Sequence, residues 1–492
     1  MIQTEPDPIV VDSPASVPGR TAKPETPSQW IWVPFVWLFF ASTRSLSTWL
    51  NPGDLDISGS PADQILMTVL IVLGLLVLNS RAEQTKRILT RNKWVLVLFL
   101  DMALSVIWSN FPGISLKRCI RSMGALVMVL VVLTEQNPLG AMRVLLRRLY
   151  LVLIPFSIIA IKYFRHVGVL YNWNGAEEEW VGLTTDKNSL GQLAMCSGVF
   201  YTWQIFQNWP KKKLTLDLLL LILTFWLLRG SKNSHSSTAI IAFAVCATIL
   251  FGLQFIRKRA ARAKRIILGA TVVSMLLAPF VYLVFEAFDT TPVTLALSAT
   301  GRDFTFTDRT LLWADVLHNA ERSPVVGVGI GAFWVGPIGY AMYPLDKWSG
   351  KTPEWRPQQG HNGYIDVYVE LGVIGVVLLL IIIGIGFAGA LDDLQNQFAL
   401  GSLRLVLLLS IVMNNMTETS FLKGTHDLWF LFLLVAINVP TATRQMRSKK
   451  LARLKSDPFA LASNSDSNFC LARALFIYHR TVWPLIARRR FS

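Results

Sequence analysis

The chain has 492 residues, of which 52% are hydrophobic and only 16% charged, with a formal net charge of +16. This composition excludes a string of soluble domains, in which about 25% of residues are charged, and is typical of a polytopic membrane protein. The positive charge does not indicate nucleic-acid binding, because the Lys and Arg residues lie between apolar segments rather than in one basic patch.

The first 29 residues are rich in proline and contain Glu5, Asp7 and Asp12. A cleaved signal peptide would begin with a basic stretch, which is absent here. Residues 1–29 are therefore predicted to form a disordered cytoplasmic arm.

Apolar segments dominate the rest of the chain. A helix needs about 20 mostly apolar residues to cross a hydrocarbon core of about 30 Å. On this criterion we predict an all-α polytopic protein with about twelve transmembrane helices, nine in residues 30–286 and three in residues 363–440. The predicted spans are 30–49, 64–79, 94–109, 119–134, 149–163, 189–207, 214–228, 237–255, 266–286, 363–388, 401–416 and 426–440.

Lys and Arg residues are unequally divided between the two sides of these spans. With residues 1–29 in the cytoplasm, 31 of the 47 Lys and Arg residues lie in segments on the cytoplasmic side. Cytoplasmic loops of membrane proteins carry such an excess, so both termini are predicted to be inside. Residues 441–492 form a basic cytoplasmic tail, which either binds anionic lipid headgroups or is simply solvated.

The largest segment between spans, residues 287–362, lies on the opposite side and is where we expect function. Irregular backbone must lie in water or line a cavity, and loops on a rigid scaffold commonly carry chemistry. Thr310–Asn319 is predicted to be a short amphipathic helix, and Gly327–Gly331 a glycine-dependent turn.

Four motifs in and around this loop resemble those of the O-antigen ligase and polymerase superfamily, and most closely its exopolysaccharide polymerases (Wzy-type, ExoQ-like). The resemblance covers about residues 95–440. The motifs are Trp108–Arg118, Thr184–Gly191, Ala299–Trp313 with Pro324–Trp334, and His361–Gly375.

This resemblance implies a GT-C-like, metal-independent glycosyltransferase without a cofactor, in the bacterial inner membrane, with residues 287–362 as a periplasmic loop. It would polymerise polyprenyl-pyrophosphate-linked oligosaccharide repeat units into exopolysaccharide or O-antigen. Its partners would be that lipid-linked glycan, a glycan or lipid acceptor, membrane lipids and a chain-length regulator. Two alternatives stay open: an O-antigen ligase that transfers finished glycan to lipid A-core or another acceptor, and a polysaccharide or lipid-linked glycan transporter.

Six cations are candidates for binding the pyrophosphate. A guanidinium group binds phosphate oxygens bidentately, and charge placed at a departing oxyanion is often the largest catalytic contribution. For Arg302 and Arg309 the alternative is an ion pair with a nearby carboxylate, and for Lys187 it is contact with lipid headgroups. The candidates are Arg302, Arg309, Lys187, Arg118, Arg121 and Arg229.

His361, at the start of the tenth predicted span, matches the loop histidine of the family. An imidazole can accept the proton of an attacking hydroxyl, or it can hydrogen-bond the pyrophosphate. Asp366 and Glu370 lie one helical turn apart, where either carboxylate can orient His361, act as the base, or pair with a cation of a neighbouring span. The predicted catalytic set is His361, Arg302, Arg309, Asp366 and Glu370.

Overall fold

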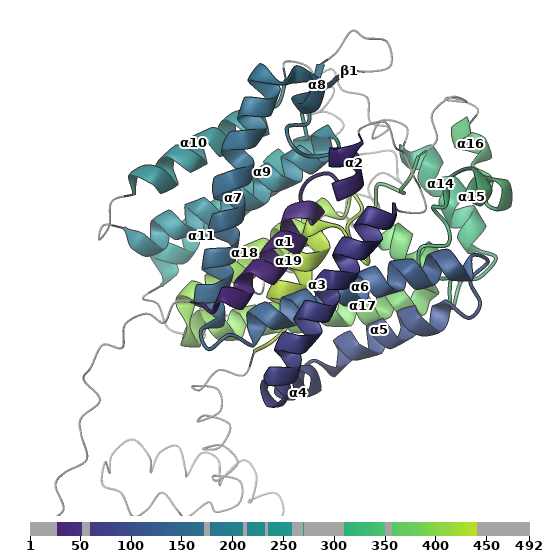
Figure 1. Cartoon of the computed structure of the whole chain (residues 1–492), viewed down its shortest axis with the longest axis horizontal. Helices are drawn as coiled ribbons and strands as arrows, with labels where there is room; N and C mark the ends of the chain where they lie inside the picture. The colour runs from purple at the N-terminus through teal and green to yellow at the C-terminus, as the bar shows by residue number, and fades with distance from the viewer. Residues whose placement is uncertain are drawn as a thin grey trace, which may run out of the picture. The chain divides into compact units, whose positions relative to one another are not determined.

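Helices dominate the described residues of the computed structural model, which are 27–51, 60–171, 178–209, 214–231, 235–257, 269, 309–349 and 357–439 (Figure 1). The first half of the chain contains η1 (Gln29–Ile31), α1 (Trp32–Ala41), α2 (Leu46–Leu50), α3 (Pro61–Ser80), α4 (Ala82–Arg91), α5 (Lys93–Ser105), α6 (Pro112–Leu133), α7 (Pro138–Tyr163), α8 (Arg165–Gly168), α9 (Lys187–Asn208), α10 (Thr215–Arg229) and α11 (Ser237–Ile256). The second half contains α14 (Arg309–Ala320), α15 (Gly336–Met342), α16 (Asp346–Ser349), α17 (Gly363–Asn396), α18 (Phe398–Asn414) and α19 (Asp427–Ala436).

The all-α prediction needs one correction. Strands β1 (Val169–Tyr171) and β2 (Glu178–Trp180) form a small antiparallel sheet, with Val169 opposite Trp180. Each strand has only three residues, so the signal is too short to stand out in the sequence.

Four described helices are long and apolar enough to cross a membrane: α3, α7, α11 as far as Phe255, and α17. Each coincides with a predicted span. Most other predicted spans coincide with α5, α6, α9, α10, α18 and α19, whereas residues 266–286 lie outside the described residues except for Gly269. The total of twelve spans therefore stays a prediction.

The first predicted span, residues 30–49, was wrong as a single helix. Helix α1 ends at Ala41, and α2 begins at Leu46 after Ser45, whose side chain accepts a hydrogen bond from the Thr48 amide. Between the two helices, Arg44 donates to the carbonyls of Thr184 and Val167. These polar contacts with the chain after α7 explain why the apolar run is interrupted here.

Helices α9 and α18 form the centre of the bundle, and most of their residues are buried. Their polar side chains pair inside the bundle: Gln192 donates to Asn414 at 3.0 Å, and the Trp203 indole donates to the Ala399 carbonyl at 3.0 Å. Buried polar groups need such partners, because an unpaired one costs about 1–3 kcal/mol. The pairs therefore fix the register of α9 against α18.

A buried ion pair joins the end of α17 to the start of α18. It is formed by Asp393 and Arg404, whose side chains are 2% and 4% exposed. The Arg404 guanidinium also donates to the Val435 carbonyl at 2.8 Å and to Asn438 at 2.9 Å. One arginine thus connects α17, α18 and the end of α19.

Replacing Arg404 with methionine should destabilise the bundle by about 3–5 kcal/mol, because it leaves a buried carboxylate without its cation. The loss should appear as a lower midpoint of thermal unfolding in detergent. Arg87→Met removes the same charge from an exposed position on α4 and serves as the control. Equal unfolding midpoints for the two variants would contradict a stabilising role for this ion pair.

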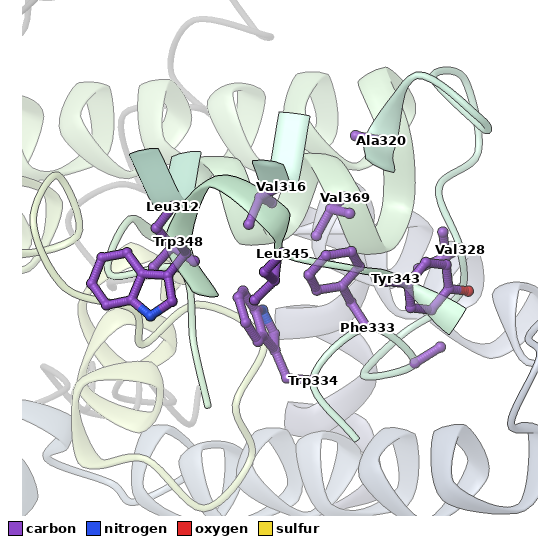
Figure 2. Packing of buried hydrophobic residues seen from close by; sticks show 11 residues of the cluster. Leu312, Val316, Ala320, Val328, Phe333, Trp334, Tyr343, Leu345, Trp348 and Val369 are labelled. Carbon is purple, nitrogen blue, oxygen red and sulfur yellow. The ribbon is translucent and has the colours of Figure 1, made fainter. Parts of the chain in front are cut away.

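The loop helices pack on the first turns of α17 around a small apolar core. In Figure 1, α14, α15 and α16 lie together beside the bundle. Figure 2 shows the side chains of this core gathered between α14, the segment after Val328 and Val369 of α17. The core comprises Leu312, Val316, Ala320, Val328, Ala332, Phe333, Trp334, Tyr343, Leu345, Trp348 and Val369. The predicted helix at Thr310–Asn319 is confirmed as α14, and its apolar face anchors the loop.

Candidate functional site

A histidine, a glutamate and an arginine from three separate segments meet where α14, α17 and the α18–α19 connection converge. The Glu418 carboxylate accepts from Arg309 Nη2 at 2.8 Å through Oε1 and lies 3.0 Å from His361 Nδ1 through Oε2. The side chain of Glu418 is 5% exposed, whereas those of His361 and Arg309 are 16% and 17% exposed. Both oxygens of one nearly buried carboxylate are therefore used to hold two partly accessible groups.

This contact fixes the chemistry of the imidazole. Nδ1 must carry a proton to donate to a carboxylate, so Nε2 of the neutral ring has a free lone pair. A histidine oriented by a carboxylate in this way is the usual arrangement of a general base. His361 can therefore accept a proton at Nε2 while Glu418 stabilises the resulting imidazolium.

Local structure sets His361 at the very start of α17. Asn362 caps this helix by accepting from the amides of Tyr364 and Ile365, and His361 just before it has a φ of 49°. The Gly363 amide donates to the carbonyls of Asn415 and Glu418 at 2.8 and 3.0 Å. The start of α17 is thus bonded directly to the segment that carries Glu418.

The segment after α18 is folded around the Asn415 side chain. Its Oδ1 accepts from the amides of Ser420 and Phe421 at 2.9 and 3.2 Å, and its Nδ2 donates to the Ile411 carbonyl at 2.9 Å. Such asparagine bonds replace backbone partners in a tight turn. They hold Glu418 rigidly against His361.

A break in α17 receives the glycine turn of the loop. At Gly372, φ is 63° and ψ is −164°, so the helix is interrupted one turn after Val369. The Val369 and Glu370 carbonyls accept from the amides of Val328 and Gly329 at 3.0 and 2.9 Å. On the other side of the break, the Val373 amide donates to the Pro324 carbonyl at 2.9 Å and the Ile374 amide to the Val325 carbonyl at 3.3 Å. The loop backbone thus replaces the hydrogen bonds that the helix loses, as broken membrane helices require.

The predicted glycine turn is confirmed, because Gly327, Gly329 and Gly331 all have positive φ. At Gly331 a Cβ atom would lie 2.2 Å from Cδ of Arg118. The missing side chain lets Arg118 reach the Gly331 and Trp334 carbonyls at 2.5 and 2.9 Å. Arg118 thereby joins the start of α6 to the loop.

Beside the His361 cluster lies a cavity of about 380 Å³, walled by the start of α6, the glycine turn, the first turns of α17 and the α18–α19 connection. Its charged lining residues are Arg118, Arg121, Asp366, Glu370 and Lys423. Asp366 accepts from the Trp334 indole at 3.0 Å and from the Gly360 amide at 3.1 Å. Burial lowers the pKa of the Lys423 ammonium group, while Asp366 and Glu370 oppose this shift by favouring its charged form.

The structure separates the predicted site residues into groups. Asp366 and Glu370 line the cavity with Arg118 and Arg121, and the expectation that either carboxylate orients His361 was wrong, because Glu418 makes that contact. Arg309 does pair with a carboxylate, that of Glu418.

Lys187 pairs with Glu179 of β2 at 2.6 Å. Arg229 is exposed at the end of α10, and neither residue lines the cavity. Arg302, like Asp303 and Asp308, lies outside the described residues.

Two residues of the site, Glu418 and Lys423, are absent from the predicted set. The signal was a polar run, Asn414 to Ser420, between two apolar segments. Because a short run of this kind is also typical of an ordinary loop, the sequence does not distinguish a site from a connection. Only the approach of the Asn415 turn to Gly363 brings Glu418 to His361.

Three of the four motifs converge on this region. Ser109 packs against Gly329, Arg118 bonds the glycine turn, and Gly329 bonds α17. Residues 218–380 match the family model described as O-antigen ligase. The match contains the predicted catalytic residues but ends before Glu418 and Lys423. Enzymes of that family transfer glycans, and the chain is similar to them over this stretch. With four described helices long and apolar enough to cross a membrane, the chain is a multi-pass membrane protein.

A curated relative supports the same resemblance. The chain is 27% identical over 311 residues to the exopolysaccharide production protein ExoQ of Rhizobium meliloti strain 1021. The aligned part covers 62% of this chain and 66% of the relative. The resemblance to O-antigen ligases and exopolysaccharide proteins predicted from the four motifs is thus confirmed.

Proposed function

We propose that the protein is a membrane glycosyltransferase that polymerises polyprenyl-pyrophosphate-linked repeat units into exopolysaccharide or O-antigen. The observation that carries the proposal is the Glu418 carboxylate, which holds a histidine and an arginine side by side and directly precedes Thr419 in the wall of a cavity. A base next to a phosphate-binding cation is what transfer from a pyrophosphate donor requires.

In the proposed reaction, a hydroxyl of the acceptor glycan attacks the anomeric carbon of the donor from the face opposite the pyrophosphate. The new C–O bond forms as the bond from the anomeric carbon to the pyrophosphate oxygen breaks, and the configuration is inverted. His361 Nε2 takes the hydroxyl proton, and the departing oxygen keeps the bonding electron pair. The remaining N–H groups of Arg309, together with Arg302, stabilise the developing negative charge.

The proposed orientation places this site in the periplasm. Helices α6, α9 and α17 begin at the membrane surface opposite the connections that are rich in Lys and Arg. Cytoplasmic loops carry the excess of Lys and Arg, so the termini are inside and the donor is used at the outer face of the inner membrane. A chain-length regulator and membrane lipids are the proposed further partners.

Reconstitution tests the function directly. The full-length protein in liposomes is incubated with a lipid-pyrophosphate repeat unit in the presence of EDTA, with and without a lipid A-core acceptor. A ladder of repeat multiples without added acceptor supports a metal-independent polymerase, whereas one addition that requires lipid A-core identifies a ligase. Movement of intact lipid-linked glycan across the liposome, without any new glycosidic bond, would identify a transporter and contradict the proposal.

Glu418→Gln should lower the turnover number by about 10²-fold or more while changing the KM for the donor little, because the amide no longer holds the imidazole in its proton-accepting form. Glu418 is a positioning residue, so Glu418→Asp should retain part of the activity. The check is a kcat and KM comparison at matched amounts of folded protein. A rise in KM with unchanged kcat would instead indicate that Glu418 serves only to bind substrate.

A further inference from the structure

The cavity beside His361 contains charged groups that the proposed reaction does not use. Its walls come from α6, the glycine turn, α17 and the α18–α19 connection, and two aromatic side chains, Trp334 and Phe421, line it. Its volume of about 380 Å³ is near the lower end of the ~300–1,000 Å³ found for small-molecule sites. It therefore suits one or two sugar residues rather than a long glycan.

Two of the five charged side chains hold the cavity walls together. Arg118 donates to the Gly331 and Trp334 carbonyls, and Asp366 accepts from the Trp334 indole and the Gly360 amide. These bonds direct both side chains to the protein backbone and to Trp334.

The other three are the groups that a ligand would meet. Within the described residues, the Arg121 guanidinium donates no hydrogen bond, and Lys423 donates one, to Gln359 at 2.9 Å. The Glu370 carboxylate accepts a hydrogen bond from the Gly331 backbone, is close enough to Asp366, Arg118 and Lys423 to interact with their charges, and lines the cavity. Arg121 and Lys423 thus offer hydrogen-bond donors to a ligand, and Glu370, which is 9% exposed, offers an acceptor.

This mixture distinguishes among ligand classes. A pyrophosphate offers only acceptor oxygens, so it could pair with the cations of the lining but would bring like charge to Asp366 and Glu370 and give them no donor. A metal cation would be repelled by Arg118, Arg121 and Lys423. A sugar hydroxyl both donates and accepts, and the apolar face of a pyranose ring can lie against Trp334 or Phe421. The lining therefore fits a hydroxyl-rich, uncharged ring.

The cavity shares backbone with the catalytic cluster. Gly360, which bonds Asp366, precedes His361, and Thr419, which lines the cavity, follows Glu418. The Asn362 amide also donates to the Thr419 hydroxyl at 3.2 Å. A sugar held in the cavity is consequently adjacent to the residues that orient the base.

We propose that this cavity binds a sugar residue of the acceptor glycan, with Glu370 accepting from its hydroxyls and Arg121 and Lys423 donating to them. The assignment to the acceptor rests on the proposed function, since the donor sugar carries the pyrophosphate that the two carboxylates disfavour. Glu370 and Arg121 are in this view sugar-binding residues, and the pyrophosphate is held by Arg309, which shares Glu418 with His361.

The test measures binding separately from turnover. The probe is the repeat-unit oligosaccharide released from its lipid by mild acid, titrated into the full-length protein in detergent by calorimetry. Glu370→Gln should weaken binding by about tenfold or more, because a hydrogen bond to a charged acceptor is lost. Arg121→Gln should weaken it similarly, and Glu83→Gln, the same change at an exposed position on α4, should leave it unchanged.

Inorganic pyrophosphate is the second ligand to be titrated. The change in affinity caused by Glu370→Gln has opposite signs for a pyrophosphate site and for a sugar site. Removing the Glu370 charge would tighten pyrophosphate binding in a pyrophosphate site and weaken oligosaccharide binding in a sugar site. Tighter pyrophosphate binding by Glu370→Gln, or oligosaccharide binding unchanged in both Glu370→Gln and Arg121→Gln, would overturn the proposal. If the wild-type protein shows no transferase activity but its oligosaccharide binding depends on Glu370, the cavity is a sugar site without the proposed role in binding an acceptor. Transfer that proceeds with no dependence on Glu370 would leave the proposed function and exclude this cavity from it.

Discussion

His361→Ala is expected to lower the rate of glycan transfer by about 10²–10⁴-fold without removing the protein from the membrane. Glu418 holds Nδ1 of the imidazole at 3.0 Å, which leaves Nε2 to accept the proton of the attacking hydroxyl. Without it, the attacking hydroxyl must lose its proton to water. Arg309 and Glu418 remain paired, so binding of the donor should change far less than turnover.

Initial rates of ladder formation in liposomes measure this effect, and the donor KM separates loss of the base from loss of binding. His318→Ala is the matched control, because His318 lies on α14 with 75% of its side chain exposed. Normal chain lengths with His361→Ala at matched protein levels would contradict the role of His361. A large rise in donor KM with unchanged kcat would instead assign His361 to the pyrophosphate.

The helices were largely predictable because membrane length and apolar composition constrain them strongly. Ten of the predicted spans coincide with single described helices, and an eleventh, residues 30–49, is divided between α1 and α2. Hydropathy does not report a polar connection that is bonded to another segment, which is why the interruption around Arg44 was missed. The short β1–β2 sheet was missed for a related reason, since its pairing depends on the Val169–Trp180 register rather than on a long pattern.

The site was only partly predictable. His361 and Arg309 do meet, and Asp366 and Glu370 line the neighbouring cavity, but the sequence spacing associates His361 with Asp366 and Glu370 on one helix. Residue spacing along one helix cannot reveal a partner from a segment 57 positions away. Glu418 reaches His361 because the Asn415 side chain folds its own turn and because Gly363 permits close approach. The pairing is therefore a property of the tertiary structure.

The break in α17 also depends on tertiary contacts, and its glycine leaves no room for a side chain. A Cβ atom on Gly372 would lie 2.2 Å from the Val325 carbonyl oxygen and 2.3 Å from its carbon, in a backbone with φ of 63°. Backbone atoms cannot move aside as a flexible side chain would. The close approach of Gly372 to Val325 also positions the loop segment whose carbonyls accept from the Val373 and Ile374 amides.

Gly372→Ala should therefore destabilise the protein by about 2–6 kcal/mol, combining backbone strain of about 1–3 kcal/mol with a similar cost of overpacking. Expected consequences are a lower yield of monodisperse protein and a lower midpoint of thermal unfolding in detergent. Gly384→Ala in the same helix is the control, because a Cβ atom there meets nothing within 4 Å. That variant should be neutral, or stabilised by up to about 1 kcal/mol through better helix propensity. If the two variants unfold at the same temperature, α17 can close its break without Gly372, and the loop would then be held by the apolar core around Val369 alone.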